Sequence, residues 1–446
     1  MQFSSFTPPD MLAVFILLIM IRPAIAVTRF ALCPAAAKRH YPAMIRARLR
    51  WKHLARQLGF ARLEVVNRSG DPMLDARPVM HHPKAKFRAD QFGWHARVRT
   101  VPKVGRAQLE QSADHVANAW RCHRVSVTQT GPGRIVLRGM RRDPLAEPFG
   151  QDGAPAGTYD GAPDPTRLYV GRDEFGADRY APIAGLTGVS VVGLPGYGKT
   201  SLVLSWLMQL AGTPAVTFVF IDGKNGGDYR DWAPRAWLTA GDELDDAAAT
   251  LDEVHSLMRD RLRAVGTGTG PRNRWHVGPT EDYPLVVVII DEAHTFFDLD
   301  AVKGNKDAEL QARACRHLTG QLIKKGRSVL FLTVLLTQKG TSDAIPTAIR
   351  DNCGLGLSLA VKTKDAAVAG LGEAIKEYPS YCPTGLRDRS MIGVATASLP
   401  TGADPFVRIR VPEISEDAAA DRALATASMR QDPSGLVPAV PRLVAV

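Results

Sequence analysis

The sequence has few cysteines, and they lie far apart. The five are Cys33, Cys122, Cys315, Cys353 and Cys382. No two form a C-x-x-C pair, which argues against a structural zinc site or a dithiol redox motif. An odd, scattered set is typical of a reducing compartment. His81 and His82 have no further ligand at metal-binding spacing, so we interpret them as surface residues.

Acidic residues are absent between Met11 and Glu64. The whole chain carries 56 Lys and Arg against 45 Asp and Glu, a net charge of +11. This excess favours a polyanionic partner, either nucleic acid or an anionic membrane surface, although an inert basic surface has the same composition. With 446 residues and a hydrophobic fraction of 45%, the chain has room for two or three domains with real cores.

Only one long apolar run is present, at Met11–Ile21, and it resumes at Ala24–Val27 after Arg22 and Pro23. About 17 residues is the short limit for a membrane span. A cleaved signal peptide, a wrongly assigned start codon and a peripheral segment are the alternatives. Because basic residues follow the run and none precedes it, we expect a single-pass or peripheral anchor in residues 1–30 with the remainder in the cytoplasm.

The composition predicts five parts. They are the segment 1–30, a basic juxtamembrane helix with a small α+β domain at 31–142, a Gly/Pro-rich linker at 143–165, the main domain at 166–412 and a tail at 413–446. The basic helix covers Ala43–Phe60 and has an apolar face with Trp51, Leu54 and Leu58. It fits contact with anionic lipid, contact with DNA, or a solvated surface helix. In the small domain, we expect a hairpin across the turn Thr130–Gly133.

In the main domain, strands alternate with helices. The expected strands are Val189–Val192, Val216–Ile221, Leu285–Ile290, Ser328–Thr337, Leu355–Val361, Met391–Ala395 and Phe406–Val411, with helices at Thr200–Leu210, Asp242–Val265 and Lys306–Lys325. Continuous apolar strands that alternate with helices predict an α/β fold with a mainly parallel sheet.

A glycine-rich loop follows the first of these strands. It runs Gly193, Leu194, Pro195, Gly196, Tyr197, Gly198, Lys199 and Thr200, with Ser201 next to it. Glycine, four residues and then Gly-Lys-Thr is the phosphate-binding loop, whose backbone N–H groups converge on phosphate oxygens. Lys199 would reach the terminal phosphates and Thr200 would coordinate Mg²⁺. The strand before it and the helix after it favour an ATP site over an inert turn.

Asp291 and Glu292 follow the buried strand Leu285–Ile290, at the end where open α/β sheets bind ligands. Asp291 suits the Mg²⁺ shell, and Glu292 suits activation of the attacking water. Gln338 ends another apolar strand, where it could sense the γ-phosphate or serve as an ordinary polar residue. Asp222 and Lys224 end the Val216 strand at the same edge, and they fit nucleotide or DNA contact, or a mutual pair.

The order of these motifs resembles the DNA-pumping ATPases of the FtsK/SpoIIIE type over roughly Gly171–Val411. The further segments that carry the resemblance are Gly171–Gly176, Phe220–Lys224, Met258–Leu262, Arg327 eleven residues before Gln338, Thr341–Pro346 and Ile349–Asn352. The resemblance implies a RecA-like P-loop NTPase that assembles as a ring, a hexamer, around double-stranded DNA. ATP would then lie between subunits, with Arg327 or Arg350 supplied by the neighbour.

The chain departs from the chromosome pumps of this family in four places. Tyr197 replaces a small residue, Gln338-Lys339-Gly340 replaces Gln-Arg-Pro, and Asp291–Phe297 looks more like the Tra proteins of actinobacterial conjugative elements. About 34 residues follow Pro412, too few for the winged-helix module that reads DNA sequence in those pumps. The basic loop Gly266–Tyr283 fits a DNA-channel contact or an ordinary insertion.

These observations predict a membrane-anchored ATPase that moves double-stranded DNA between cells during conjugation. One alternative is a chromosome-partitioning pump of the same fold. Another is a nucleotide-gated membrane scaffold that recruits a transfer complex and moves nothing, although the water-activating Glu292 argues against it.

Overall fold

The computed structural model describes residues 28, 30–67, 76–150, 158–159, 162–266, 271–340, 344–399 and 405–436. The chain divides into two compact units, Met1–Asp143 and Pro144–Val446. The apolar segment Met11–Val27, predicted as an anchor, lies outside the described residues. Within the part of the chain that the structure describes, no helix is both long enough and apolar enough to cross a membrane.

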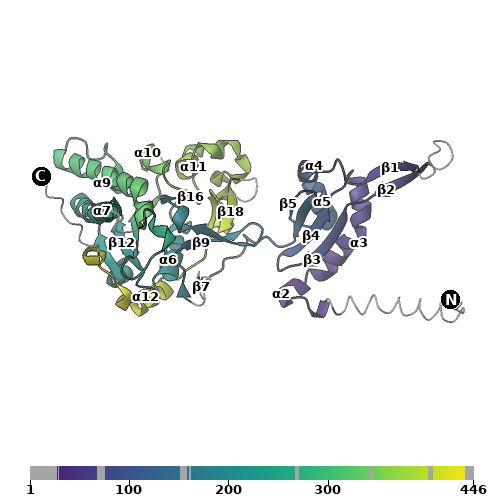
Figure 1. Cartoon of the computed structure of the whole chain (residues 1–446). Helices are drawn as coiled ribbons and strands as arrows, with labels where there is room; N and C mark the ends of the chain where they lie inside the picture. Colours follow the sequence, from purple (N-terminus) through teal and green to yellow (C-terminus); the bar gives the residue numbers. More distant parts are fainter. Residues whose placement is uncertain are drawn as a thin grey trace. The chain divides into compact units, whose positions relative to one another are not determined.

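The first unit is a small α+β fold on a four-stranded antiparallel sheet in the order β3-β4-β6-β5. These strands are β3 (Lys84–Ala89), β4 (Gly93–Arg99), β5 (Arg124–Gly131) and β6 (Arg134–Met140). Beside them lie α2 (Ala35–Lys38), α3 (Tyr41–Gln57), α4 (Arg106–Gln111), α5 (Ala113–Trp120) and the hairpin of β1 (Arg62–Asn67) and β2 (Ala76–His81) (Figure 1). The expected small α+β fold is confirmed, and β5 pairs with β6 across the predicted turn.

Helix α3 does not present an apolar face to the outside, as contact with lipid would require. Met44, Ala47, Trp51, Leu54 and Ala55 are buried along one side of it, and they pack into the core of the unit. The Trp51 indole N–H also donates to the carbonyl of Pro83, at 2.8 Å. The predicted apolar side of α3 therefore holds the helix to its own sheet, and its solvent-facing side carries the basic residues together with the exposed Leu49.

The second unit contains a ten-stranded sheet in the order β10-β9-β18-β17-β16-β11-β15-β14-β12-β13. Its strands are β9 (Arg167–Asp173), β10 (Asp178–Pro182), β11 (Gly188–Val192), β12 (Val216–Asp222), β13 (Ala236–Ala240), β14 (Leu285–Asp291), β15 (Phe331–Thr337), β16 (Leu355–Ser358), β17 (Val394–Ala397) and β18 (Val407–Arg410). The pairs from β16 to β13 are parallel, and those from β10 to β16 are antiparallel. The expected mainly parallel α/β sheet is thus confirmed, with an antiparallel edge that the pattern did not predict.

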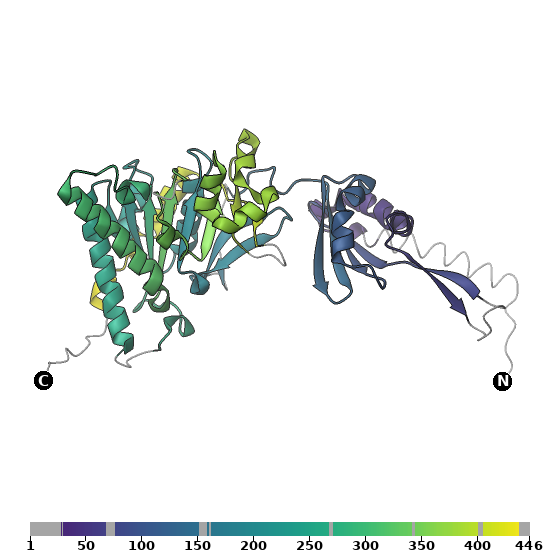
Figure 2. The ribbon, with the colours of Figure 1, turned by 90° about the horizontal axis from the view of Figure 1, so that it is seen from above.

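Both faces of this sheet are covered, which explains its continuous apolar strands. Along β14, Leu285, Val287 and Ile289 face a core shared with α6 (Lys199–Leu210) and α12 (Glu416–Ala425). The alternate residues face a second core shared with three other helices. These are α7 (Leu244–Gly266), α9 (Lys306–Lys325) and α11 (Lys364–Leu371). Helices α7 and α9 lie side by side on this second face (Figure 2).

Two predicted strand starts are wrong. Residues Ser328–Leu330 do not belong to a strand, because the chain turns there through the 3-10 helix η4 (Gly326–Val329) and Leu330 has a left-handed φ of 63°. Met391 lies in another 3-10 helix, and Gly393, with a φ of 79°, separates it from β17. In both places, a backbone turn with positive φ interrupts an apolar run, and the pattern of apolar side chains cannot predict such a turn.

The predicted tail is in part an integral piece of the second unit. Helix α12 buries Ala419 and Ala423 in the core that it shares with α6. The Ser201 hydroxyl donates to the carbonyl of Pro412 at 2.9 Å and accepts from the N–H of Ile414 at 2.8 Å. The second unit therefore continues beyond Pro412, into part of the segment 413–446 that the sequence assigned to a tail.

Arg261 is a buried cation that ties three elements of the second unit together. From α7, its Nη1 donates to the carbonyls of Pro284 (2.9 Å) and Val329 (3.1 Å), just before β14 and at the end of η4. Its guanidinium lies 4.1 Å from the ring centre of Tyr283. Burial lowers its pKa to about 10, so the group stays charged at neutral pH.

We expect Arg261→Ala to lower the free energy of unfolding by about 2–4 kcal/mol, because it removes two buried hydrogen bonds and leaves a cavity. Arg263→Ala is the matched control on the same helix, since that side chain is exposed and its one ion pair among the described residues is with Asp260. Calorimetric unfolding of the two variants measures the difference. Equal loss in both would show that Arg261 does not hold these elements together.

Candidate nucleotide-binding site

The phosphate loop Gly193–Thr200 joins the central strand β11 to helix α6, at the carboxyl edge of the parallel strands. Gly196 and Gly198 have φ values of 74° and 99°, a region that residues with a Cβ rarely adopt. A Cβ at Gly193 would come within 2.9 Å of the Leu359 side chain. Backbone conformation therefore favours glycine at 196 and 198, and close packing against Leu359 favours it at 193. The loop has the strand–loop–helix geometry that binds phosphate at a helix N-terminus.

Lys199 points its amine into this loop. Its Nζ donates to the carbonyls of Gly193 (2.7 Å) and Leu194 (3.2 Å), and the residue is buried. Burial lowers its pKa, while the carboxylates of Glu292 and Asp291 act in the opposite direction. A cation held inside a ring of backbone groups is positioned to meet phosphate oxygens that enter the loop.

Oxygen ligands suited to Mg²⁺ lie next to the loop. The Thr200 hydroxyl donates to Asp228 Oδ2 at 3.3 Å, and Asp291 Oδ2 accepts from the Tyr229 hydroxyl at 3.0 Å. Burial raises the pKa of Asp291. One hydroxyl and one or two carboxylates, completed by phosphate oxygens and water, fit the octahedral oxygen shell of Mg²⁺. Among the described residues, no group of three or more His, Cys, Asp or Glu could hold a metal alone.

Glu292 is buried beside the loop in a strained backbone conformation, with a φ of 48°. Its Oε1 accepts from the backbone N–H of Gln338 at 2.9 Å and lies 2.7 Å from His294 Nδ1. Burial acts to raise its pKa, but His294, Gln338 and Lys199 together lower it below the ordinary value. Glu292 is therefore a carboxylate at neutral pH.

The other oxygen of this carboxylate, Oε2, is buried and has no hydrogen-bond partner among the described residues. An unsatisfied buried acceptor is costly, so a water molecule that donates to it would be favoured there. The position that was predicted to activate water thus has a charged, oriented oxygen available.

Gln338 reaches Glu292 through its main chain. Strand β15 is parallel to β14, so its carboxyl end brings Thr337 and Gln338 beside the acidic pair. Asp222 ends β12 in register with Asp291, but its carboxylate accepts from the backbone N–H of Lys224. The Lys224 amine lies 3.9 Å from Asp228. Of the alternatives for Asp222 and Lys224, a mutual charge pair is not formed, because the Lys224 amine lies near Asp228 and only the Lys224 backbone N–H bonds to Asp222.

The sequence reasoning missed Asp228 and Tyr229. They follow two glycines beyond β12, in a loop without a motif, and only the folding of that loop toward Thr200 and Asp291 brings them to the site. A signal was present in the succession of a strand end, a glycine pair and an acid. This signal is common in loops of many kinds.

Tyr197 and Ser201, both predicted to belong to the nucleotide-binding residues, instead bond to other parts of the second unit. The Tyr197 hydroxyl donates to the carbonyl of Arg387 at 2.6 Å, and its ring packs with Leu386 and Val394. The Ser201 side chain is occupied by the C-terminal segment, as described above. Tyr197 therefore anchors the loop to the segment before β17, which accounts for a large residue where the family has a small one.

Arg327 and Arg350 do not join this site within the chain. Arg327 lies in η4 before β15, and Arg350 ends α10 (Thr347–Arg350) before β16. Because both strands are parallel to β11, these positions lie at the amino edge of the sheet, away from the phosphate loop. Trp275 from the basic loop donates to the carbonyl of Arg327 at 2.8 Å, so this loop is also held at that edge.

The sheet and its phosphate loop define the class as a P-loop nucleotide-binding α/β fold. The chain is 24% identical to the DNA translocase FtsK of Vibrio vulnificus over 301 residues, which is 59% of this chain and 29% of that protein. It is 25% identical to the FtsK of Vibrio parahaemolyticus over 302 residues, 59% of this chain and 28% of that protein. The chain thus matches less than a third of the length of these relatives. No protein-family model matches it.

Among solved structures, the chain resembles the pCW3 conjugation coupling protein TcpA in its monomer form with ATPgS. The TM-score is 0.53 at 15% identity, and the match covers 85% of this chain and 99% of that one. This likeness shows a shared fold. Together with the two FtsK relatives, it confirms the resemblance to FtsK/SpoIIIE-type proteins that the motifs indicated.

We expect Thr200→Ala and Ser201→Ala to separate binding from stability. Thr200→Ala removes a hydroxyl at the site and should weaken Mg²⁺-dependent ATP binding about tenfold or more. Ser201→Ala removes the two hydrogen bonds to the C-terminal segment and should cost about 1–2 kcal/mol of stability while ATP affinity is retained. Isothermal titration and calorimetric unfolding measure the two quantities. Strong loss of ATP affinity in Ser201→Ala would contradict this division.

Proposed function

We propose that the chain is an ATP-driven translocase of double-stranded DNA that acts in the transfer of plasmid DNA between cells. The observation that carries the proposal is the meeting of Lys199, Asp291 and Glu292 at the carboxyl edge of the sheet, with one oxygen of Glu292 buried and unpaired. The named activity of the FtsK relatives supports DNA as the substrate that is moved. The conjugation coupling protein of the same fold supports plasmid transfer over chromosome partitioning.

In this function, the loop N–H groups and Lys199 bind the phosphates of ATP. Thr200 and Asp291 hold Mg²⁺, which neutralises charge on the phosphate oxygens when it is bound. Glu292 orients a water molecule through Oε2 and takes its proton. Because Gln338 donates its backbone N–H to Oε1 of the same carboxylate, a movement of β15 changes the orientation of Glu292.

A ring supplies the remaining cation from a neighbouring subunit. Of the two candidates, Arg327 is exposed, and no described residue bonds to its side chain. Arg350 pairs with Asp351 at 3.0 Å, and its side chain is only 10% exposed. Arg327 therefore suits action on a neighbour's ATP, and Arg350 suits a role within its own subunit. The hexameric ring, and attachment to the cell membrane through residues 1–30, are parts of the same proposal.

We expect Glu292→Gln to retain ATP binding and to lower DNA-stimulated hydrolysis about 100-fold or more, because the amide cannot accept the proton of water. Glu281→Gln, an exposed acid in the loop before β14, is the matched control. Phosphate release with and without duplex DNA measures hydrolysis, and triplex displacement measures movement. Undiminished turnover in Glu292→Gln would refute its role. Turnover without displacement in the unmodified protein would favour a membrane scaffold.

His294→Ala should shift the acid limb of the pH–rate profile to higher pH. His294 is the first of the partners that lower the pKa of Glu292, and without it the effect of burial, which raises that pKa, is less opposed. Glu292 would then become protonated, and inactive as a base, at a higher pH than before. His317→Ala, at an exposed histidine on α9, should leave the profile unchanged. An unshifted limb in His294→Ala would show that another group sets it.

A further inference from the structure

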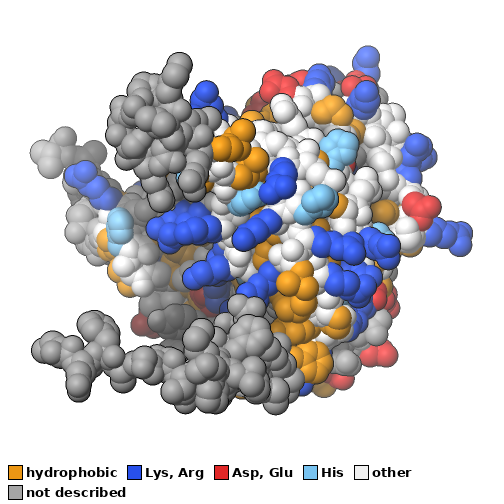
Figure 3. All heavy atoms as spheres, turned by 90° about the vertical axis from the view of Figure 1, so that its right-hand side faces the viewer, with side chains coloured by type: hydrophobic (Ala, Val, Ile, Leu, Met, Phe, Trp, Pro, Cys, Tyr) orange, Lys and Arg blue, Asp and Glu red, His pale blue; other side chains and the backbone are white. Residues whose placement is uncertain are grey.

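The positive charge of the chain is concentrated in the first unit. Residues 1–143 contain 25 Lys and Arg against 8 Asp and Glu, a net charge of +17. Residues 144–446 contain 31 against 37, a net charge of −6. The unit without the nucleotide site thus carries the whole excess. Lys and Arg side chains gather over one face of it, with few acidic side chains among them (Figure 3).

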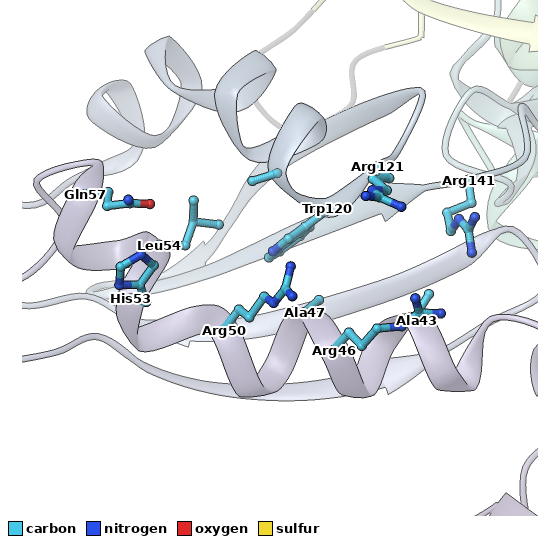
Figure 4. A pocket seen from close by; sticks show the side chains of 11 residues that line it. Ala43, Arg46, Ala47, Arg50, His53, Leu54, Gln57, Trp120, Arg121 and Arg141 are labelled. Atoms are coloured by element: carbon cyan, nitrogen blue, oxygen red, sulfur yellow. The ribbon is translucent and has the colours of Figure 1, made fainter.

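A groove of about 380 Å³ is open on this unit. One wall is helix α3, which contributes Arg46 and Arg50, with His53 and Gln57 on the same side. The other wall contributes Arg121, directly after α5, and Arg141, directly after β6. In Figure 4, Arg50 extends away from α3, whereas Arg46 runs along the helix toward Ala43, where its Nε donates to the carbonyl of Pro42 at 3.4 Å. No acidic residue lines the groove.

The four arginines are exposed. None of them forms an ion pair with any residue that the structure describes, whereas Arg138 in the same unit pairs with Asp90 at 3.0 Å. A cluster of unpaired guanidinium groups repels itself, so an anionic ligand that enters between them is stabilised by all four.

Arg121 occupies a position that favours glycine. It caps α5 with a left-handed φ of 54°, and its backbone N–H bonds to the carbonyls of Ala117 and Asn118. Helices often end on glycine in this conformation, which is unfavourable for a residue with a Cβ. Strain at a position that carries a charge into a groove is typical of a binding site.

The floor of the groove supplies a further donor. Trp120 lines it, is 6% exposed, and its indole N–H is buried without a hydrogen-bond acceptor among the described residues. A buried N–H without an acceptor destabilises the unit, and a ligand oxygen that displaced the covering side chains would satisfy it. The groove is therefore rich in hydrogen-bond donors and has no carboxylate in its lining to accept from them.

The phosphodiester backbone of DNA fits this groove better than a membrane surface does. The basic side of α3 from Arg46 to Gln57 runs for about 16 Å, along which a nucleic acid strand presents successive phosphates. A helix that binds lipid inserts a whole apolar face, but the apolar residues of α3 lie mostly in the core, and Leu49 is its one large apolar side chain that is exposed. Both walls of the groove can contact a nucleic acid backbone that lies between them, whereas a flat membrane would contact only the rim of the groove.

We propose that this groove is a second DNA-binding site, which grips the phosphate backbone of duplex DNA independently of ATP and without reading its sequence. The choice of DNA deepens the function proposed above and rests on it, but the site is separate from the motor. It gives the chain a hold on DNA during the steps in which the motor releases it.

The test compares two double variants of the full chain that lose the same charge from the same helix. Arg46→Ala/Arg50→Ala removes two of the four groove arginines, and Lys52→Ala/Arg56→Ala removes two exposed cations of α3 outside the groove. Binding of a fluorescein-labelled duplex is followed by anisotropy without nucleotide over a range of salt concentrations. Flotation with vesicles of phosphatidylglycerol and phosphatidylcholine provides the lipid arm.

We expect the groove variant to bind DNA about tenfold more weakly at physiological ionic strength, with a log–log salt slope smaller by about two than that of the control variant. Equal DNA binding by the two variants would overturn the proposal. So would a loss of vesicle binding in the groove variant with DNA binding intact, because that result would assign the groove to lipid.

Arg121→Gly provides an independent arm that a folding defect cannot imitate. Glycine relieves the left-handed strain, so the thermal midpoint should not fall, while DNA affinity should. Unchanged DNA affinity in this variant would count against the groove. Lys199→Ala should lose ATP hydrolysis yet retain nucleotide-free DNA binding, so that a failure of the motor assignment and a failure of the groove assignment give different results.

Discussion

The parallel register of β14, between β12 and β15, is the constraint on which the candidate site depends. It places Asp222 beside Asp291, and it brings Gln338 to the carboxylate of Glu292. The next strand outward from β15 is β11, which delivers the phosphate loop to the same edge. If β14 slipped by one residue, its two buried faces would exchange, and Asp291 would no longer lie opposite Asp222. The close packing of apolar side chains on both faces therefore fixes the geometry of the charged groups.

Much of this site could be predicted from sequence, because its residues follow directly from strand ends. The helix Lys306–Lys325 has the predicted bounds, and the phosphate loop and acidic pair lie where their strands end. Asp228 and Tyr229 could not be predicted, because a loop fold and not a strand brings them in. The same holds for Ser201, whose partners lie more than 200 residues away in the chain. Local sequence patterns predict helices and strands well, but they do not predict which distant segment forms hydrogen bonds with a given side chain.

The basic helix α3 shows how one pattern can be correct and its interpretation incomplete. Its periodicity predicted an apolar side and a basic side, and both exist. The sequence could not show what covers the apolar side, since the answer depends on a sheet formed by later residues. Once that side is buried, the charged side is what remains for a partner. The charge difference between the two units then becomes informative, which the net charge of the whole chain concealed.

The hydrogen bonds between Ser201 and the segment Pro412–Ile414 have a consequence for the order in which the protein matures. A chain leaves the ribosome from its N-terminus, so the phosphate loop emerges long before the segment that braces it. Strand β9, near the start of the second unit, pairs with β18, which is made much later. Contacts of such long sequence separation cannot form until both segments have been made, and closing such large loops slows folding. The second unit therefore stays incomplete until the chain has been made as far as the segment Pro412–Ile414.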